Sequence, residues 1–173
     1  MDPGGEPGNN YDNDGAGYLG IAIGNRASSE RYGTAVGPFA KAGALSNATG
    51  FYAQSLGEYS AAYGAGAKAI NAYGVAFGQG AVVSFGKPLK EEEYNTLPES
   101  DKKLFTAVRT ENAKTVYYQT KILLQDGSTQ DQRIFSVAIG ASAAATDNNA
   151  VAIGYRSSAD EMGAVGILSL IHI

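Results

Sequence analysis

The sequence contains no cysteine, no tryptophan and only one histidine, His172. The lack of cysteine excludes a disulfide framework and thiol catalysis, although it does not indicate a cellular compartment. Because His172 lies in an atypical C-terminal segment, imidazole acid–base chemistry and metal binding have no candidate residue. We therefore expect no enzyme activity, no catalytic residue, no metal site and no cofactor.

Charged residues are scarce as well, at 17% of the chain, and the net charge is −4. An acidic chain argues against a nucleic-acid partner, since such proteins usually carry a basic patch that neutralises phosphates. No apolar run approaches the roughly 18 residues of a membrane-spanning helix. The first twenty residues also lack the basic and apolar segments of a signal peptide, so we expect no membrane segment in this sequence.

Glycine, with 23 residues, and alanine are abundant. Large apolar side chains are too thinly spread for a conventional layered globule, which favours a regular, repetitive structure.

The tripeptide Ala-x-Gly recurs along the chain at nearly constant spacing. From copy to copy the number of its glycine increases by 13, 13, 14, 14, 62, 14 and then 12. The regular copies begin and end at Ala22 and Gly24, Ala35 and Gly37, Ala48 and Gly50, Ala62 and Gly64, Ala76 and Gly78, Ala138 and Gly140, and Ala152 and Gly154, with a less regular copy at Ala164 and Gly166. We assign these residues a structural role in a repeat of about 14 residues that one long gap interrupts.

Each repeat contains two short segments in which small residues recur at every second position. In the second segment these residues follow the glycine by three and five positions, as Ala40 and Ala42 follow Gly37. Small residues two positions apart indicate β-strands, and the glycine between the segments provides the backbone freedom of a tight turn. The sequence therefore predicts an all-β solenoid of 14-residue coils, each adding one strand to each of two parallel sheets.

In the clearest copies the first strand of a coil is apolar on both sides of its alanine, which predicts that both faces of this strand are buried. The candidate residues for the roll core or an oligomer contact are Ile21, Ile23, Val75, Phe77, Val137, Ile139, Val151 and Ile153. A 14-residue coil covers only one face of each sheet, so the second apolar face requires a partner chain. The pattern predicts an oligomer and leaves open which face meets the partner.

The second strand carries mostly polar residues between its small ones, which predicts a sheet with one face in solvent. Lys41, Gln54 and Lys68 lie on this face and are candidate ligand-binding residues. Tyr117 and Tyr118 are two further candidates, since they lie in a predicted strand where one ring packs and the other is exposed.

The long gap between repeats holds a segment of different composition, residues 84–133. Sixteen of its 50 residues are charged, against 14 of the other 123, so we interpret it as an insert. Ser100 as N-cap, followed by Leu104, Phe105 and Val108 at helical spacing, predicts a short helix. Asp126-Gly127 predicts the turn of a β-hairpin, whose return strand enters the next coil.

Outside the repeat segments 20–83 and 134–166, we expect residues 1–19 to form a flexible lead-in and 167–173 to be foreign to the protein. Residues 15–20 satisfy G-x-G-x-x-G, yet no strand precedes them and no helix follows, so dinucleotide binding is not expected. The acidic run Glu91–Glu93 is interpreted as a solvated helix start or loop.

The sequences SVAIG at 136–140 and NAVAIG at 149–154, whose glycines each open a Gly-x-x-small-x-small pattern, resemble the YadA-like head of trimeric autotransporter adhesins. The resemblance covers residues 20–83 and 134–166. It implies a left-handed parallel β-roll, a homotrimer, and attachment to a Gram-negative outer membrane through a stalk and a C-terminal anchor. Family heads are not enzymes and bind host extracellular matrix, including collagen, or cell surfaces. The collagen-associated Asn-Ser-Val-Ala-Ile-Gly pattern is altered here, because Ala150 replaces its serine and Phe135 replaces the asparagine before Ser136.

Two alternatives accompany the adhesin hypothesis. The roll could be a spacer whose insert is the only binding element. A trimeric left-handed β-helix acyltransferase is the other alternative, but it predicts a period of six residues per flat side and a catalytic histidine, and the sequence has neither.

Overall fold

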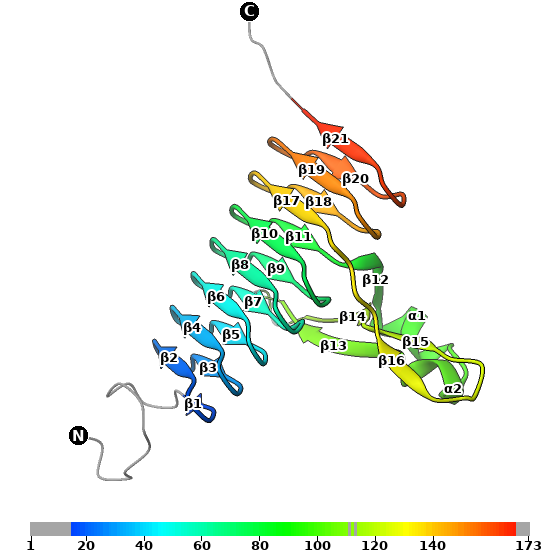
Figure 1. The fold of residues 1–173 in the computed structure, drawn as a ribbon, viewed down its shortest axis with the longest axis horizontal. Helices are drawn as coiled ribbons and strands as arrows, with labels where there is room; N and C mark the ends of the chain where they lie inside the picture. Colours follow the sequence, from blue (N-terminus) through cyan, green and yellow to red (C-terminus); the bar gives the residue numbers. More distant parts are fainter. Residues whose placement is uncertain (1–14, 111, 113, 169–173) are drawn as a thin grey trace, which may run out of the picture.

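The computed structural model describes residues 15–110, 112 and 114–168. They form a parallel β-solenoid of two eight-stranded sheets, which confirms the predicted fold class (Figure 1). Sheet 1 contains the three-residue strands β2 (Ile21–Ile23), β4 (Thr34–Val36), β6 (Asn47–Thr49), β8 (Ala61–Tyr63), β10 (Val75–Phe77), β17 (Val137–Ile139), β19 (Val151–Ile153) and β21 (Val165–Ile167). Sheet 2 contains the two-residue strands β1 (Gly15–Ala16), β3 (Ser28–Ser29), β5 (Lys41–Ala42), β7 (Gln54–Ser55), β9 (Lys68–Ala69), β11 (Val82–Val83), β18 (Ala144–Ala145) and β20 (Ser158–Ala159).

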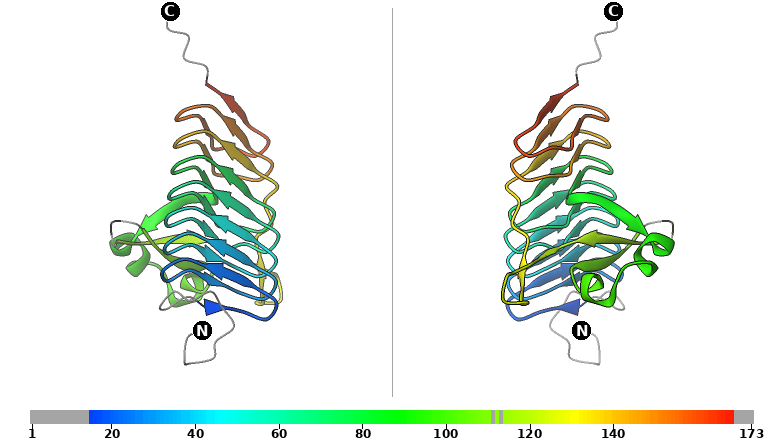
Figure 2. Two further views of the ribbon diagram at one scale, coloured as in Figure 1. Left: turned by 90° about the vertical axis from the view of Figure 1, so that its left-hand side faces the viewer. Right: turned by 90° about the vertical axis from the view of Figure 1, so that its right-hand side faces the viewer.

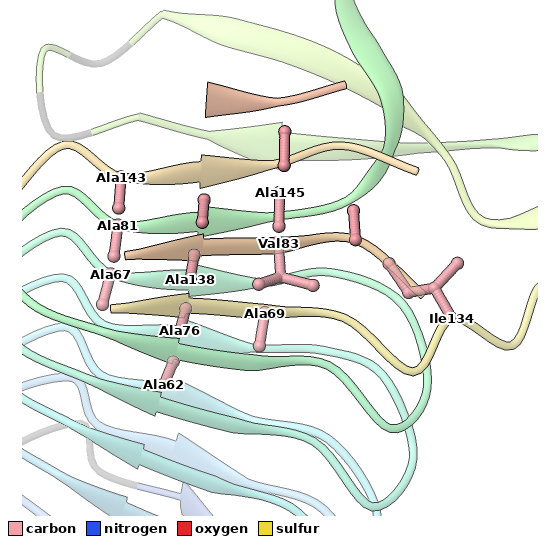
Figure 3. Packing of buried hydrophobic residues seen from close by; sticks show 13 residues of the cluster. Ala62, Ala67, Ala69, Ala76, Ala81, Val83, Ile134, Ala138, Ala143 and Ala145 are labelled. Atoms are coloured by element: carbon pink, nitrogen blue, oxygen red, sulfur yellow. The ribbon is translucent and has the colours of Figure 1, made fainter. Parts of the chain in front are cut away.

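The interior between the two sheets is built almost entirely from small side chains. Every sheet 1 strand except β21 has a middle alanine, and these alanines pair in register from coil to coil, as Ala62 does with Ala76 and Ala76 with Ala138. These alanines are fully buried, and Figure 3 shows them stacked in a column that faces similar columns from sheet 2. Because the alanines point inward, the flanking valines and isoleucines point outward, so the structure shows which side of these strands faces the interior of the solenoid.

The turns between the two strands of a coil require glycine at their first position. Gly37 has a φ of 125°, and a Cβ atom there would lie 2.7 Å from the carbonyl oxygen of Gly50 in the next coil. The Ala40 N–H donates to the Gly37 carbonyl at 3.1 Å and closes the turn. The third turn residue, Phe39, has a φ of 59°, as a type II turn demands. Glycine therefore recurs at this turn position because the backbone of the next coil lies too close for a Cβ atom.

The insert leaves the solenoid after β11 and forms its own small α+β unit (Figure 1). Its elements are β12 (Phe85–Lys90), α1 (Glu91–Asn95), α2 (Glu99–Lys102), β13 (Phe105–Arg109), β14 (Thr115–Gln119), β15 (Lys121–Leu123) and β16 (Thr129–Asp131). The first three strands form an antiparallel sheet in the order β12-β14-β13, and β15 pairs with β16 as the predicted hairpin around Asp126-Gly127. No helix among the described residues is long and apolar enough to cross a membrane.

The solenoid continues across the insert with its register unchanged. β10 pairs with β8 on one side and β17 on the other, and the Ile134 N–H donates to the Ala72 carbonyl at 3.1 Å. If residues 86–133 were removed, Gly78 and Gly140 would be one repeat apart in the sequence, as Gly64 and Gly78 are. The insertion is therefore two residues shorter at its start than the predicted 84–133.

A short helix does form in the predicted segment as α2, but Leu104, Phe105 and Val108 are not part of it. Ser100 lies inside α2 rather than at its N-cap, and Phe105–Arg109 is strand β13. The spacing of Leu104 and Val108 suits a helix, but pairing of β13 with β14 overrides it. The acidic run does begin a helix: Glu93 accepts a hydrogen bond from the Lys90 N–H at 2.8 Å at the start of α1.

The solenoid extends past both predicted boundaries. Gly15 and Ala16 form β1 and pair with β3, so these two residues of the G-x-G-x-x-G match belong to the first coil rather than to a lead-in. At the other end, Ile167 pairs with Ile153, and Gly166 occupies the place of Ala152. Ala164-Val165-Gly166 is therefore not an in-register Ala-x-Gly copy, and Ile167 belongs to the repeat. His172 lies outside the described residues.

Candidate binding surfaces

The outward side chains of sheet 1 form an apolar surface along the solenoid. We call this surface, made of the first and third residues of each sheet 1 strand, the apolar face. All eight residues predicted for a core or an oligomer contact lie on it, and none lies between the sheets. Phe77 is 55% exposed and Ile23 is 41% exposed, whereas the alanine between each pair is buried.

The apolar face is most continuous in the C-terminal coils. From β10 to β21 each strand presents a valine and either phenylalanine or isoleucine, and Tyr63 of β8 lies against Phe77 with ring centroids 5.9 Å apart. Asn47 and Thr49 interrupt the face in β6. A soluble single chain rarely exposes such a continuous apolar strip, so this surface is typical of one that another molecule covers.

The outward surface of sheet 2 is only partly exposed, because the insert packs against it. Gln54 is buried and therefore not a solvent-facing ligand residue, contrary to the expectation for this face. Lys68 is half-buried, and its Nζ donates to the Gly66 carbonyl at 3.2 Å. Lys41 is exposed as expected. The polar strand pattern was correct, but it could not reveal that a later segment of the chain returns to cover the strand.

Two hydrogen bonds and an apolar cluster hold the insert on sheet 2. Gln54 Nε2 donates to the Arg109 carbonyl at 2.8 Å, and Asn71 Nδ2 donates to the Gln119 carbonyl at 3.0 Å. Between them, Ile70 of the solenoid packs with Val108 and Tyr118 of the insert. Figure 2 shows the resulting position of the insert, beside the N-terminal half of the solenoid. Buried amides on sheet 2 thus dock the insert rather than a ligand.

Tyr117 and Tyr118 point to opposite sides of β14. Tyr118 is buried against sheet 2, and this burial raises its pKa to about 12. Tyr117 is half-buried and stacks on Tyr94 of α1, with ring centroids 3.7 Å apart. Tyr118 is therefore a structural residue and not part of a ligand face.

Aromatic ladders along the turns were missed in the sequence. Phe39 and Tyr52 stack at 4.7 Å, whereas in the other row of turns Tyr73 stacks on Tyr59 at 5.3 Å and on Phe135 at 5.0 Å. Phe39, Tyr52, Tyr59 and Tyr73 all have positive φ. Aligning the third turn residue at the period of 13 or 14 would have found both rows, since stacked coils place equivalent residues one above another.

Comparison with protein families supports the assignment that the fold indicates. A parallel β-solenoid with a repeated Ala-x-Gly coil defines the class as a solenoid repeat protein. Residues 134–157 match the YadA head domain repeat in two copies, and this segment contains β17, β18 and β19. The match supports a YadA-like head domain, which suggests a protein of the trimeric autotransporter adhesin type. A search of curated proteins finds no match to the chain.

Proposed function

We propose that the chain is the head of a trimeric adhesin on a Gram-negative cell surface. Three copies join through the apolar face, and the remaining surface binds extracellular matrix or cell-surface ligands without catalysing a reaction. The observation that carries the proposal is the apolar face, which extends over successive coils and is left uncovered by the described part of the chain. The YadA head repeat supports three as the number of copies.

Assembly also serves the binding role. A column with many weak contact points gains avidity when several copies engage one surface, because each later contact forms at a high effective concentration. The solenoid suits this role because its strands pair in register along the whole stack, which holds the repeated surface in a fixed geometry.

A binding panel tests the adhesive role. The purified chain is applied to immobilised matrix proteins, including collagen, and to cultured host cells, with an unrelated acidic protein as the control. We expect retention on at least one of these surfaces. Retention no greater than that of the control on every surface would overturn the proposal.

The insert gives a second candidate function specific support, because it is a folded unit with its own exposed surface. In that case the solenoid is a spacer and the insert is the binding element. Deleting residues 86–133 restores the regular repeat spacing between Gly78 and Gly140, so the shortened chain tests the two candidates directly. Adhesion that survives the deletion belongs to the solenoid, and adhesion that is lost belongs to the insert.

A further inference from the structure

The apolar face contains one polar layer, at strand β6. Of the sheet 1 strands that the structure describes, only β6 presents two polar side chains outward, Asn47 and Thr49, on either side of the buried Ala48. Both are exposed, and neither side chain forms a hydrogen bond among the described residues. An amide or a hydroxyl that is buried without a partner destabilises an interface. This layer therefore weakens assembly unless a second copy supplies the missing partners.

Two columns of side chains extend along the apolar face, one from the first and one from the third residue of each strand. In-register pairing aligns the columns, as between Asn47 and Ala61 and between Thr49 and Tyr63. In a closed threefold ring each copy contacts the next through two different edges of the same surface. The first-residue column of one copy therefore faces the third-residue column of the next copy.

The two columns complement each other layer by layer. In β8 the small Ala61 shares its layer with the large Tyr63, and in β6 the Asn47 amide shares its layer with the Thr49 hydroxyl. Between copies at the same height, the small side chain faces the large one and the amide faces the hydroxyl. A surface with this arrangement fits a second copy of the same chain.

Displacement of one copy by a single coil, about 4.8 Å, breaks this match. Asn47 would then face Val36 or Tyr63 of the next copy, and its amide would lose the hydroxyl partner. The last three layers do not oppose the displacement, because β17, β19 and β21 all present one valine and one isoleucine. The relative height of the copies is therefore specified by the layers of β6 and β8.

We propose that Asn47 of each copy forms a hydrogen bond with Thr49 of the next copy, in a polar layer that holds three copies at the same height. Each copy contributes both residues, so the bond forms three times around the ring. A single polar layer in an apolar interface specifies register in coiled coils by the same means. This inference rests on the proposed trimer and names the residues that select a level copy as the partner.

The same substitution in two adjacent layers tests the hydrogen bond. Thr49→Val leaves three Asn47 amides unpaired, so the concentration at which half of the chains have left the trimer should rise at least about tenfold. The matched control is Thr34→Val in β4, where the facing column presents Val36, and it should lower that concentration about threefold. Light scattering of the full chain over a dilution series, in urea that brings dissociation into the measured range, compares the variants.

A second substitution in the polar layer should reverse the loss. When Asn47→Leu is added to Thr49→Val, no polar group of the layer is left unpaired, so the trimer should be more stable than that of Thr49→Val alone. Shifts of the same sign for Thr49→Val and Thr34→Val would overturn the proposal. A double variant no more stable than Thr49→Val would overturn it as well.

The chain lacks cysteine, so single cysteine substitutions can report the relative height of the copies. Val151→Cys in one chain faces Ile153→Cys in a co-expressed chain when the copies are level, and faces Ile139→Cys after a displacement of one coil. A disulfide forms only between facing positions, so the level pair should give at least about fivefold more cross-linked product than the displaced pair. Equal yields from the two pairs would contradict the level arrangement.

The two proposals fail separately. A native chain that stays monomeric refutes assembly through the apolar face, and the polar layer with it. A native trimer in which Thr49→Val strengthens assembly refutes the polar layer alone.

Discussion

The two sheets of the solenoid have similar interior surfaces and different exterior surfaces. Facing inward, sheet 1 presents alanine and Gly166, and sheet 2 presents alanine, serine and Val83, so the interior is built from small side chains. Facing outward, sheet 1 presents mostly valine, isoleucine and phenylalanine, whereas sheet 2 presents mostly lysine, glutamine and serine. The chain covers the middle of sheet 2 with its own insert and leaves sheet 1 uncovered. The polar sheet is thus partly covered within one chain, whereas the apolar sheet is completed only if, as proposed above, further chains cover it.

The largest effect is expected where the insert covers sheet 2. Val108 is 1% exposed against Ile70, so Val108→Asp would bury an unpaired charge and should release the insert, at a cost of more than about 3 kcal/mol. The control is Ala107→Asp, the neighbouring exposed position of β13. Limited proteolysis should cut the Val108→Asp insert rapidly and leave the control intact. Equal protection of both variants would show that this contact does not hold the insert.

A smaller effect is expected from enlarging the shared interior. Ala138 is fully buried between the sheets, so Ala138→Leu should lower the free energy of unfolding by about 1–3 kcal/mol through overpacking. Ala144→Leu, in the same coil but on the outward side of sheet 2, should be tolerated. Denaturant unfolding compares the two, and equal destabilisation would contradict the inward and outward assignment.

The smallest effect is a pH dependence of insert docking. Burial raises the Tyr118 pKa to about 12 in the folded chain, against about 10 in the unfolded chain, so the folded state holds the proton more tightly. The stabilisation that the protonated Tyr118 gives the folded state is complete below pH 10 and is lost as the pH rises to 12. The loss in the free energy of unfolding is about 1.4 kcal/mol at pH 11. Hydrogen exchange of the insert should therefore accelerate between pH 10 and 12 relative to Tyr118→Phe. An identical profile in that variant would remove Tyr118 as the cause.

The repeat was predictable because alanine, glycine and period are local properties of the sequence. The sequence did not show which side of a sheet 1 strand faces the interior. Alanine and isoleucine both suit a buried β position, and only the distance between the two sheets decides which of them fits there. The docking of the insert depends on contacts between segments far apart in the sequence, such as Gln54 with Arg109. For the same reason Gln54 was expected at the surface, and the sequence did not show which of Tyr117 and Tyr118 packs against sheet 2.

The apolar face was likewise predictable in part. Its residues were identified from sequence, because apolar side chains on both sides of a strand require two buried faces. Continuity of the face depends on in-register pairing, as between Phe77 and Ile139, which places the residues in columns. Val165 and Ile167 extend the columns and were assigned incorrectly, because Gly166 was interpreted as the turn glycine.

The mass of the purified chain in solution tests the central claim most directly. Light scattering over a concentration series should give three times the 17.9 kDa of one chain. Ile153→Asp on the apolar face should shift the mass to that of one chain while circular dichroism stays unchanged, and Ser158→Asp on sheet 2 should leave the trimer intact. A native chain that stays at 17.9 kDa up to its solubility limit would contradict the account, because the apolar face would then need no partner.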